Sequence, residues 1–258
     1  MNNKPITLEE RKLVQLEMLK EIDLFCRSNN IRYSLAFGTL LGAIRHNGFI
    51  PWDDDVDIMM PLPDMIRFKE LFHSETMKYL DINTYRYFEY GFSRITNTKT
   101  YRQYGIIRSY GISIDLYPLV SIPENEEKAD DYFRKAQHLE EVCDFYKKWR
   151  SRMVNFLPLH TIPFYHYSVK KTTKHLRFTT EYGKTNKYYI IAGPIAMRKK
   201  MTYYNDIFDD LVDVVFEGNR FWAISKYDMF LTMRYGDYMT PPPIEQRHPY
   251  HGGNYYWK

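Results

Sequence analysis

The chain has 258 residues, of which 44% are hydrophobic and 26% charged, and its mean hydropathy is −0.53, as in an ordinary soluble globular protein with one large core or two small ones. The net charge of +4 is too small to indicate a nucleic-acid partner, although it is compatible with anionic substrates such as phosphates. The two cysteines, Cys26 and Cys143, form no CxxC pair or Cys/His cluster, which argues against a disulfide framework and a structural zinc site.

No run of the sequence approaches the roughly 18 apolar residues that a membrane span needs. The amino-terminal residues MNNKPITLEERK lack the apolar segment of a signal peptide. These features predict a protein of the reducing cytoplasm, with peripheral contact at the inner face of a membrane as a further possibility.

The first predicted element is an amphipathic helix from residue 8 to residue 29 or 30. Thr7 and Glu10 have the spacing of a capping box, and apolar residues follow every three to four positions: Leu13, Leu16, Leu19, Ile22 and Cys26. A strand over residues 31–37 should follow, then a turn at Gly38, a short helix with Thr39 as its N-cap, and a second strand over residues 55–59.

The next elements are a helix over about residues 64–73, after Pro61 and Pro63, and strands around residues 79–87, 91–96 and 111–117. After Pro123 an acidic first turn predicts a helix that continues into the Trp149 region. Near the carboxyl terminus, Ser225 and Asp228 have capping-box spacing and predict a short helix that ends at Gly236.

The segment GTLLGAIRHNGFIPWDDDVDI, residues 38–58, combines a glycine turn, a short helix and closely spaced carboxylates. Asp55 and Asp57 on one strand would share a face, with Cα atoms roughly 6.5 to 7 Å apart. In GISIDLYPL, Asp115 lies on the face opposite the apolar residues and offers a third carboxylate. Three such groups suit Mg²⁺ or Mn²⁺, which also bind phosphate oxygens, and the helix N-terminus after Gly38 and Thr39 could hold phosphate.

Neighbouring residues allow more than one interpretation. Asp53 shares the alternation of Asp55 and Asp57, whereas Asp54 is expected to pair with Arg45 or to stabilise a turn. Arg45 and His46 either contact phosphate or complement the dipole of the helix that they end.

Three segments resemble the LicD family, which includes the fukutin-related phosphotransferases: residues 38–58, SIDLYPL, and YGDYMTPPPIEQRHPYH. The resemblance runs in order along the chain and is weakest between residues 124 and 218. It implies an α+β nucleotidyltransferase-like fold of the polymerase β type, with a mixed sheet. It also maps the metal-binding carboxylates to Asp55, Asp57 and Asp115, and places Arg247 and His248 in a closing motif that meets the donor's phosphates.

The implied reaction is metal-dependent transfer of phosphocholine, or a similar phospho-alcohol, from CDP-choline or another CDP-alcohol to a sugar hydroxyl, with release of CMP. The acceptor would be a cell-surface glycan or its lipid-linked precursor. One alternative is a nucleotidyltransferase that attaches NMP from an NTP to a small acceptor. Another is a sugar-binding or membrane-docking module in which the aspartates hold structural Ca²⁺, although the spacing is not that of an EF-hand.

The predicted organisation is a catalytic core over residues 1–122 and a mostly helical region over residues 123–258, whose last part, about 219–258, returns to the active cleft. Residues 145–180 contain eight Lys and Arg residues and no acid. This segment is a solvated helical face, an acceptor-binding surface or a contact with an anionic membrane. No RNP-type strand or recognition helix accompanies it, so nucleic acid is not expected.

Two further patterns have weaker functional interpretations. His248 and His251 invite a zinc site, but no acidic or thiol third ligand lies nearby in the sequence, so a loop that closes over the active site is preferred. A choline group would need an aromatic cage, for which the chain offers two clusters of rings: Tyr101, Tyr104 and Tyr110, and Tyr255, Tyr256 and Trp257.

Overall fold

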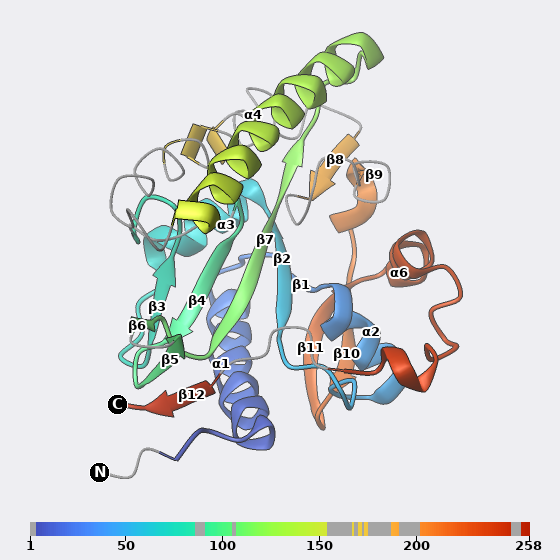
Figure 1. Cartoon of the computed structure of the whole chain (residues 1–258). Coiled ribbons are helices and arrows are strands. Elements are labelled where there is room, and N and C mark those ends of the chain that lie inside the picture. Colours follow the sequence, from blue (N-terminus) through green and yellow to red (C-terminus); the bar gives the residue numbers. More distant parts are fainter. Residues whose placement is uncertain are drawn as a thin grey trace. The chain divides into compact units, whose positions relative to one another are not determined.

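The computed structural model describes residues 4–85, 91–104, 107–153, 167, 170–171, 173–174, 187–190, 202–248 and 254–258 (Figure 1). It contains two units. The first comprises Met1–Tyr79, Arg94–Leu116 and Ile207–Lys258, and the second comprises Leu80–Ser93 and Tyr117–Asp206. This division differs from the boundary predicted at residue 122, because the last residues of the chain belong to the same unit as the first.

Helix α1 (Leu8–Ser28) confirms the predicted capping box and amphipathic pattern. The Glu10 N–H donates to the Thr7 hydroxyl at 3.2 Å, and the Thr7 N–H donates to the Glu10 carboxylate at 2.8 Å. Of the predicted apolar stripe, four residues are buried: Leu16, Leu19, Ile22 and Cys26. Leu13 is 63% exposed instead.

The main sheet has the order β1-β2-β7-β4-β3, formed by β1 (Ser34–Leu35), β2 (Asp57–Pro61), β7 (Ser113–Ser121), β4 (Ser93–Asn97) and β3 (Met77–Leu80). Strand β1 is antiparallel to β2, with Leu35 opposite Ile58. Strands β2 and β7 run in the same direction, whereas β4 between β7 and β3 runs in the opposite one (Figure 1). The protein is therefore α+β with a mixed sheet, as predicted at this level.

Helix α2 (Phe37–His46) begins three residues earlier than predicted, and α3 (Leu62–Leu71) follows β2. The N-cap of α2 is Ala36, so the prediction of Thr39 as N-cap is wrong. Phe37 has a positive φ of 44°, which lets the chain turn from β1 directly into the helix. Thr39 is buried, and its hydroxyl accepts the Asp57 N–H at 2.8 Å, which joins α2 to the start of β2.

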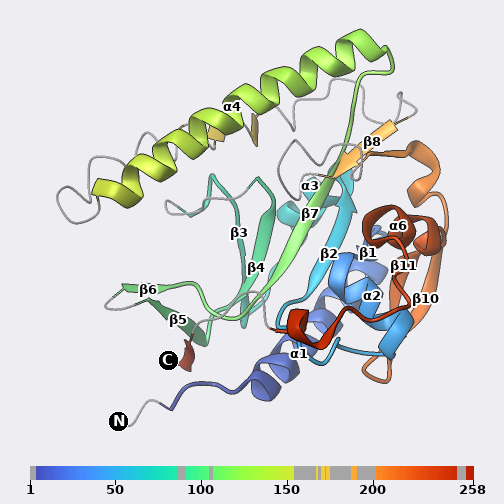
Figure 2. The same ribbon diagram turned by 45° about the vertical axis from the view of Figure 1, so that its right-hand side comes forward.

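A second, three-stranded sheet was not predicted from the sequence. It consists of β5 (Thr100–Tyr104), β6 (Ile107–Ser109) and β12 (Asn254–Trp257), in the order β12-β5-β6. Strand β12, close to the carboxyl terminus, pairs antiparallel with β5, with Tyr256 opposite Tyr101 (Figure 2). The amino terminus joins this sheet, because the Ile6 N–H donates to the Tyr255 carbonyl at 2.7 Å.

The rest of the first unit contains the hairpin β10 (Leu211–Phe216) and β11 (Asn219–Ile224), helix α6 (Tyr227–Tyr235) and the 3-10 helix η3 (Ile244–Gln246). Helix α6 ends at Gly236 as predicted, where φ is 72°. The predicted capping box is wrong, because the N-cap is Lys226 and forms no side-chain capping bond. Asp228 instead accepts a hydrogen bond of 2.6 Å from the Tyr238 hydroxyl.

The second unit contains α4 (Glu126–Met153), β8 (Lys187–Ile190) and β9 (Thr202–Tyr204), and η2 (Asn205–Phe208) spans the boundary between the units. Strand β8 pairs with β9 and with the last residues of β7. The predicted long helix is confirmed by α4, but the prediction of a mostly helical remainder is wrong for the described residues from 187 onward. There the aromatic and β-branched segments KYYI, TYY, LVDVVF, NRFWAI and NYYW form strands.

Most of the basic segment after residue 153 lies outside the described residues. Among the helices that the structure describes, none is both long enough and apolar enough to cross a membrane.

Candidate active site

Helix α1 positions the acidic segment that precedes β2. Arg11 Nη1 lies 3.0 Å from Asp54 Oδ2, and both side chains are buried. Gln15 Nε2 donates to the Asp54 carbonyl at 3.5 Å and to the Ser113 carbonyl at 3.2 Å. The predicted partnership of Asp54 with Arg45 is therefore wrong: the amphipathic pattern of α1 places an arginine on its buried face, and this arginine neutralises Asp54.

Asp57 and Asp115 lie on neighbouring strands. The Asp115 N–H donates to the Val56 carbonyl at 2.9 Å. Because β2 and β7 run in the same direction, this bond pairs Asp115 with Asp57, and paired residues project from the same face of a sheet. Asp57 and Asp115 thus lie at paired positions of neighbouring strands, whereas Asp55 precedes β2, which begins at Asp57 rather than at the predicted residue 55. That the three carboxylates meet at one ion stays a prediction.

The carboxylates concentrate negative charge in a buried place. Asp57 is only 7% exposed, and its Oδ1 has no hydrogen-bond partner. Burial raises the pKa of Asp57 well above its ordinary value, and the charges of Asp55, Asp115 and Asp53 raise it further. The pKa of Asp53 is raised to about 7, first by burial and then by Asp55.

These properties fit a divalent cation. Carboxylate oxygens of Asp53, Asp54 and Asp55 lie within 4.8 Å of one another, and the buried Oδ1 of Asp57 lacks the hydrogen bond that a buried polar atom normally makes. Hard cations such as Mg²⁺ and Mn²⁺ bind oxygen ligands of this kind. A cation at the carboxylates of Asp53, Asp55 and Asp57 would relieve their mutual repulsion.

Asp115 has a strong partner that the sequence did not reveal. Arg94 on β4 donates from Nε to Oδ1 of Asp115 and from Nη2 to Oδ2, the latter at 2.5 Å. Arg94 Nη1 donates to the Tyr110 hydroxyl, and Cζ lies 5.0 Å from the centre of the Tyr110 ring. The sequence gives one indication of this partner, which is the arginine within the segment SRITN. In the structure, all residues of this strand are buried. Whether Asp115 binds metal or acts as a base stays a prediction.

Gly38 allows a carboxylate to approach α2. A Cβ at this position would lie 2.6 Å from Oδ2 of Asp53, so only glycine leaves room for that side chain. The preceding Phe37 holds a positive φ, which is rare for a bulky residue and is typical of functional sites. Gly38 therefore lies inside α2 and not in the predicted turn, and the packing of Asp53 against the first turn of the helix is the physical reason for a glycine there.

Two arginines lie near each other beside the acidic segment. Arg45 Nη1 donates to the Tyr238 carbonyl at 2.6 Å, and Arg247 lies over the Trp52 ring, with Cζ 5.1 Å from its centre. Burial lowers the pKa of Arg45, and the positive charge of Arg247 lowers it further. The pKa of His46 is lowered by burial and by Arg45.

Within the described part of the chain, neither Arg45 nor Arg247 forms an ion pair with a carboxylate. Two adjacent guanidinium groups without such a counter-ion are suited to bind an oxyanion such as a phosphate. Trp52, over whose ring Arg247 lies, directly precedes Asp53 in the sequence.

Tyr235, the last residue of α6, also reaches the acidic cluster. The residue is 40% exposed as a whole, yet the pKa of its hydroxyl is raised by burial and by the charges of Asp57 and Asp53, with Arg234 opposing the shift. The sequence placed Tyr235 in the segment YGDYMTPPP without assigning it a role. It is a further candidate for contact with a substrate.

The remaining candidates give less information. His248 is exposed, and His251 lies outside the described residues. Of the aromatic rings considered for choline, Tyr101 stacks on Tyr256 at 5.4 Å, and Tyr110 contacts Arg94.

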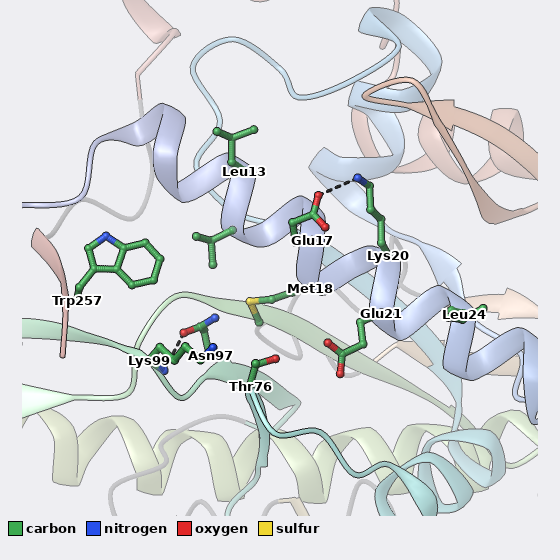
Figure 3. Close-up of a pocket in the computed structure, with 11 residues that line it drawn as sticks. Leu13, Glu17, Met18, Lys20, Glu21, Leu24, Thr76, Asn97, Lys99 and Trp257 are labelled. Carbon is green, nitrogen blue, oxygen red and sulfur yellow. Dashed lines mark hydrogen bonds and ion pairs between the residues drawn. The ribbon is translucent and has the colours of Figure 1, made fainter.

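The first unit also has a groove of about 620 Å³ on the exposed side of α1, where Leu13 and Trp257 lie at one end (Figure 3). None of the clustered aspartates lines this groove.

Comparisons with known proteins place these features in a family context. The family model described as "LicD/FKTN/FKRP, nucleotidyltransferase domain" matches residues 30–172. The lipopolysaccharide cholinephosphotransferase LicD of Haemophilus influenzae is 28% identical over 257 residues, which cover 96% of this chain and 97% of that protein. Uncharacterised proteins of Rickettsia typhi and Rickettsia prowazekii are 42% and 39% identical over 65 and 62 residues, about a quarter of this chain and under a quarter of theirs.

Proposed function

The chain belongs to the LicD/FKTN/FKRP family, whose model matches more than half of it, and on this basis we propose that it is a phosphotransferase with a nucleotidyltransferase-like core of the polymerase β type. The proposed reaction moves phosphocholine, or a similar phospho-alcohol, from a CDP-activated donor to a sugar hydroxyl of a cell-surface glycan or its lipid-linked precursor. The name of the Haemophilus influenzae relative supports phosphocholine as the cargo.

The observation that carries the proposal is the buried carboxylate of Asp57. Its Oδ1 lacks a hydrogen-bond partner, and the neighbouring charges of Asp55, Asp115 and Asp53 disfavour its ionised form. A buried cluster of this kind is costly to fold without a compensating cation. An enzyme that acts on a diphosphate needs such a cation beside the reacting phosphate.

We propose Mg²⁺ or Mn²⁺ as the cofactor, held by Asp55 and Asp57 together with Asp53, and by Asp115 as the resemblance implies. When bound, the ion would neutralise charge that develops on the phosphate oxygens. Asp54 is not included, because Arg11 already neutralises it.

The protein's own groups would bind and orient the donor. Arg45 and Arg247, which lie close enough for the charge of Arg247 to lower the pKa of Arg45, would bind the diphosphate oxygens. Gly38 would keep the first turn of α2 clear for the Asp53 carboxylate. The acceptor hydroxyl would then attack the phosphorus that bears the alcohol, the bond to CMP would break, and a carboxylate of the cluster would take the hydroxyl proton.

The test is release of CMP from CDP-choline, measured by chromatography with Mg²⁺ and candidate glycan acceptors. Asp57→Asn should lower the rate by about 100-fold or more, because it removes one negative oxygen from the proposed metal site. Asp131→Asn is the matched control, since Asp131 is an exposed acid on α4 that pairs with Arg134 in the same helix. Near-normal turnover by Asp57→Asn would contradict the assignment.

A nucleotidyltransferase that transfers NMP from an NTP is the second candidate, favoured by the description of the matching family model. The two reactions have different products. Release of pyrophosphate from CTP in the presence of an acceptor, with no CMP from any CDP-alcohol, would replace the first proposal with the second.

A further inference from the structure

We infer that Arg94 is a positioning residue that holds the third carboxylate, Asp115, in the metal-free protein and competes with a divalent cation for it. The inference rests on the metal site of the proposed function, but not on the identity of the donor or the acceptor. It concerns a residue that no sequence motif singled out.

The contact between Arg94 and Asp115 is of the strongest kind that two side chains make. The guanidinium donates to both carboxylate oxygens, and each of the two side chains is only 8% exposed. The planar fork of arginine matches a carboxylate in this bidentate arrangement, which fixes the orientation of both groups. The Arg94 guanidinium therefore fixes the Asp115 carboxylate in one position.

The same contact places a positive charge where a metal ion would otherwise act. Asp115 is paired across the sheet with Asp57, whose Oδ1 has no hydrogen-bond partner and faces the combined charge of the neighbouring acids. A cation bound at Asp57 would attract the Asp115 oxygens and repel the Arg94 guanidinium, and such forces are large in a buried place. Arg94 and a metal ion thus compete for one carboxylate.

Tyr110 gives Arg94 a second partner. Its hydroxyl accepts from Nη1, and its ring lies 5.0 Å from Cζ of Arg94. A guanidinium over an aromatic ring retains part of its stabilisation when a carboxylate partner leaves. Tyr110 therefore lowers the cost of releasing Asp115 to a metal ion.

The excess of negative charge in the acidic cluster explains why the ion pair between Arg94 and Asp115 should stabilise the protein. Asp53, Asp54, Asp55, Asp57 and Asp115 gather at one place, and two buried arginines neutralise part of their charge: Arg11 at Asp54 and Arg94 at Asp115. Removal of Arg94 would leave Asp115 as a further unbalanced buried charge. The metal-free protein should then be less stable, and a cation should bind more tightly.

The experiment compares Mn²⁺ binding and thermal unfolding in wild-type protein and in Arg94→Met, a neutral side chain of similar length. Isothermal titration calorimetry with Mn²⁺ alone should give about tenfold tighter binding for Arg94→Met. Its melting temperature should fall in the presence of a chelator and recover with Mn²⁺. Arg32→Met is the matched control, because Arg32 pairs with Asp64 of α3 at 2.8 Å, outside the acidic cluster. It should lower the melting temperature without a change in Mn²⁺ affinity.

A second variant should change the Mn²⁺ affinity in the opposite direction. Tyr110→Phe keeps the ring but removes the hydroxyl that accepts from Arg94, so Arg94 should hold Asp115 more firmly and Mn²⁺ should bind about threefold more weakly. Equal Mn²⁺ affinities in wild type and Tyr110→Phe, or in wild type and folded Arg94→Met, would overturn the inference. If Arg94→Met does not fold, Tyr110→Phe decides alone.

The result of the Mn²⁺-binding experiment is independent of the test of the proposed reaction, because Mn²⁺ binding is measured without donor or acceptor. If CMP is released but the affinities are equal, the role of Arg94 is wrong and the reaction stands. If the affinities shift as expected but no CDP-alcohol is cleaved, the reaction is wrong and the role of Arg94 stands.

Discussion

At the scale of single residues, the clustered aspartates differ in how their charge is balanced. Asp54 and Asp115 have arginine partners, Arg11 and Arg94. The pKa values of Asp53 and Asp57 are raised by burial and by neighbouring acids. The protonation of the metal-free site should therefore depend on pH in a range where ordinary aspartates are fully ionised.

Asp53 makes this dependence measurable. Its pKa is about 7 in the folded protein, against 3.8 ordinarily, so between these values the folded state binds more protons than the unfolded state. The contribution of Asp53 to the free energy of unfolding is then fully present below about pH 4 and is lost as the pH rises through about 7. Urea unfolding of the metal-free protein at pH 5, 6, 7 and 8 should show this decline. In Asp53→Asn the decline should be smaller, and an unchanged slope in that variant would contradict the assignment.

At the scale of elements, helix α2 contains two glycines, Gly38 and Gly42, that are required for different steric reasons. A Cβ at Gly38 would meet the end of the Asp53 side chain, whereas a Cβ at Gly42 would collide with the backbone carbonyl of Gly48. The first obstacle is a side chain that can move, and the second is backbone that is fixed by the turn at Asn47, where φ is 56°.

The substitutions Gly38→Ala and Gly42→Ala should accordingly have different effects. Gly38→Ala should displace the Asp53 carboxylate and lower CMP release by about tenfold or more, since small errors in position are costly to catalysis. Its stability should change by less than about 1 kcal/mol, because alanine favours helix. Gly42→Ala should cost about 1–3 kcal/mol of unfolding free energy through overpacking. Urea unfolding and the CMP assay on both variants check this, and equal stability losses would contradict it.

Elements with local signals could be predicted from the sequence. The capping box of α1 and the length of α4 depend on residues a few positions apart. The pairing of Asp115 with Asp57, in contrast, joins two strands that are distant in the sequence. Strands β5, β6 and β12 could not be predicted, because they are short and pair with distant partners. The start of α2 was misplaced because no propensity scale anticipates the positive φ of Phe37.

In the candidate site, too, some features could be predicted from the sequence and others could not. The spacing of Asp55 and Asp57 is visible in the sequence, but the ion pairs Arg11–Asp54 and Arg94–Asp115 join different elements and arise only on folding. Tyr235 is similar, because the effect of Asp57 on the pKa of Tyr235 depends on where α6 ends.

At the scale of the whole molecule, the first unit is assembled from three separate segments of the chain. Residues 207–258 supply the carbonyl of Tyr238 to Arg45, and the Ile224 N–H donates to the Ser34 hydroxyl at 3.0 Å. They also supply β12, which pairs with β5, and Tyr255, whose ring lies 4.6 Å from Cζ of Arg11. The predicted core over residues 1–122 therefore lacks several of its packing partners.

A fragment of residues 1–122 should consequently not fold by itself. Its buried face around β1 and α2 would be exposed, because β10, β11 and α6 are absent. We expect the fragment to show no cooperative thermal transition by circular dichroism, under conditions in which the full chain melts cooperatively. A sharp transition with native-like near-ultraviolet signal would show instead that the first 122 residues are an autonomous domain.

The pairing of β12 with β5 has a consequence for biosynthesis. Tyr255 packs on Arg11, which in turn binds Asp54, yet translation adds Tyr255 long after both of these residues. A nascent polypeptide that still lacks β12 therefore carries this surface open, and the acidic segment gains its full support only once β12 has been synthesised. Ribosomes stalled ahead of residue 254 would hold an immature product, and a premature stop codon there would yield one that quality-control proteases can recognise.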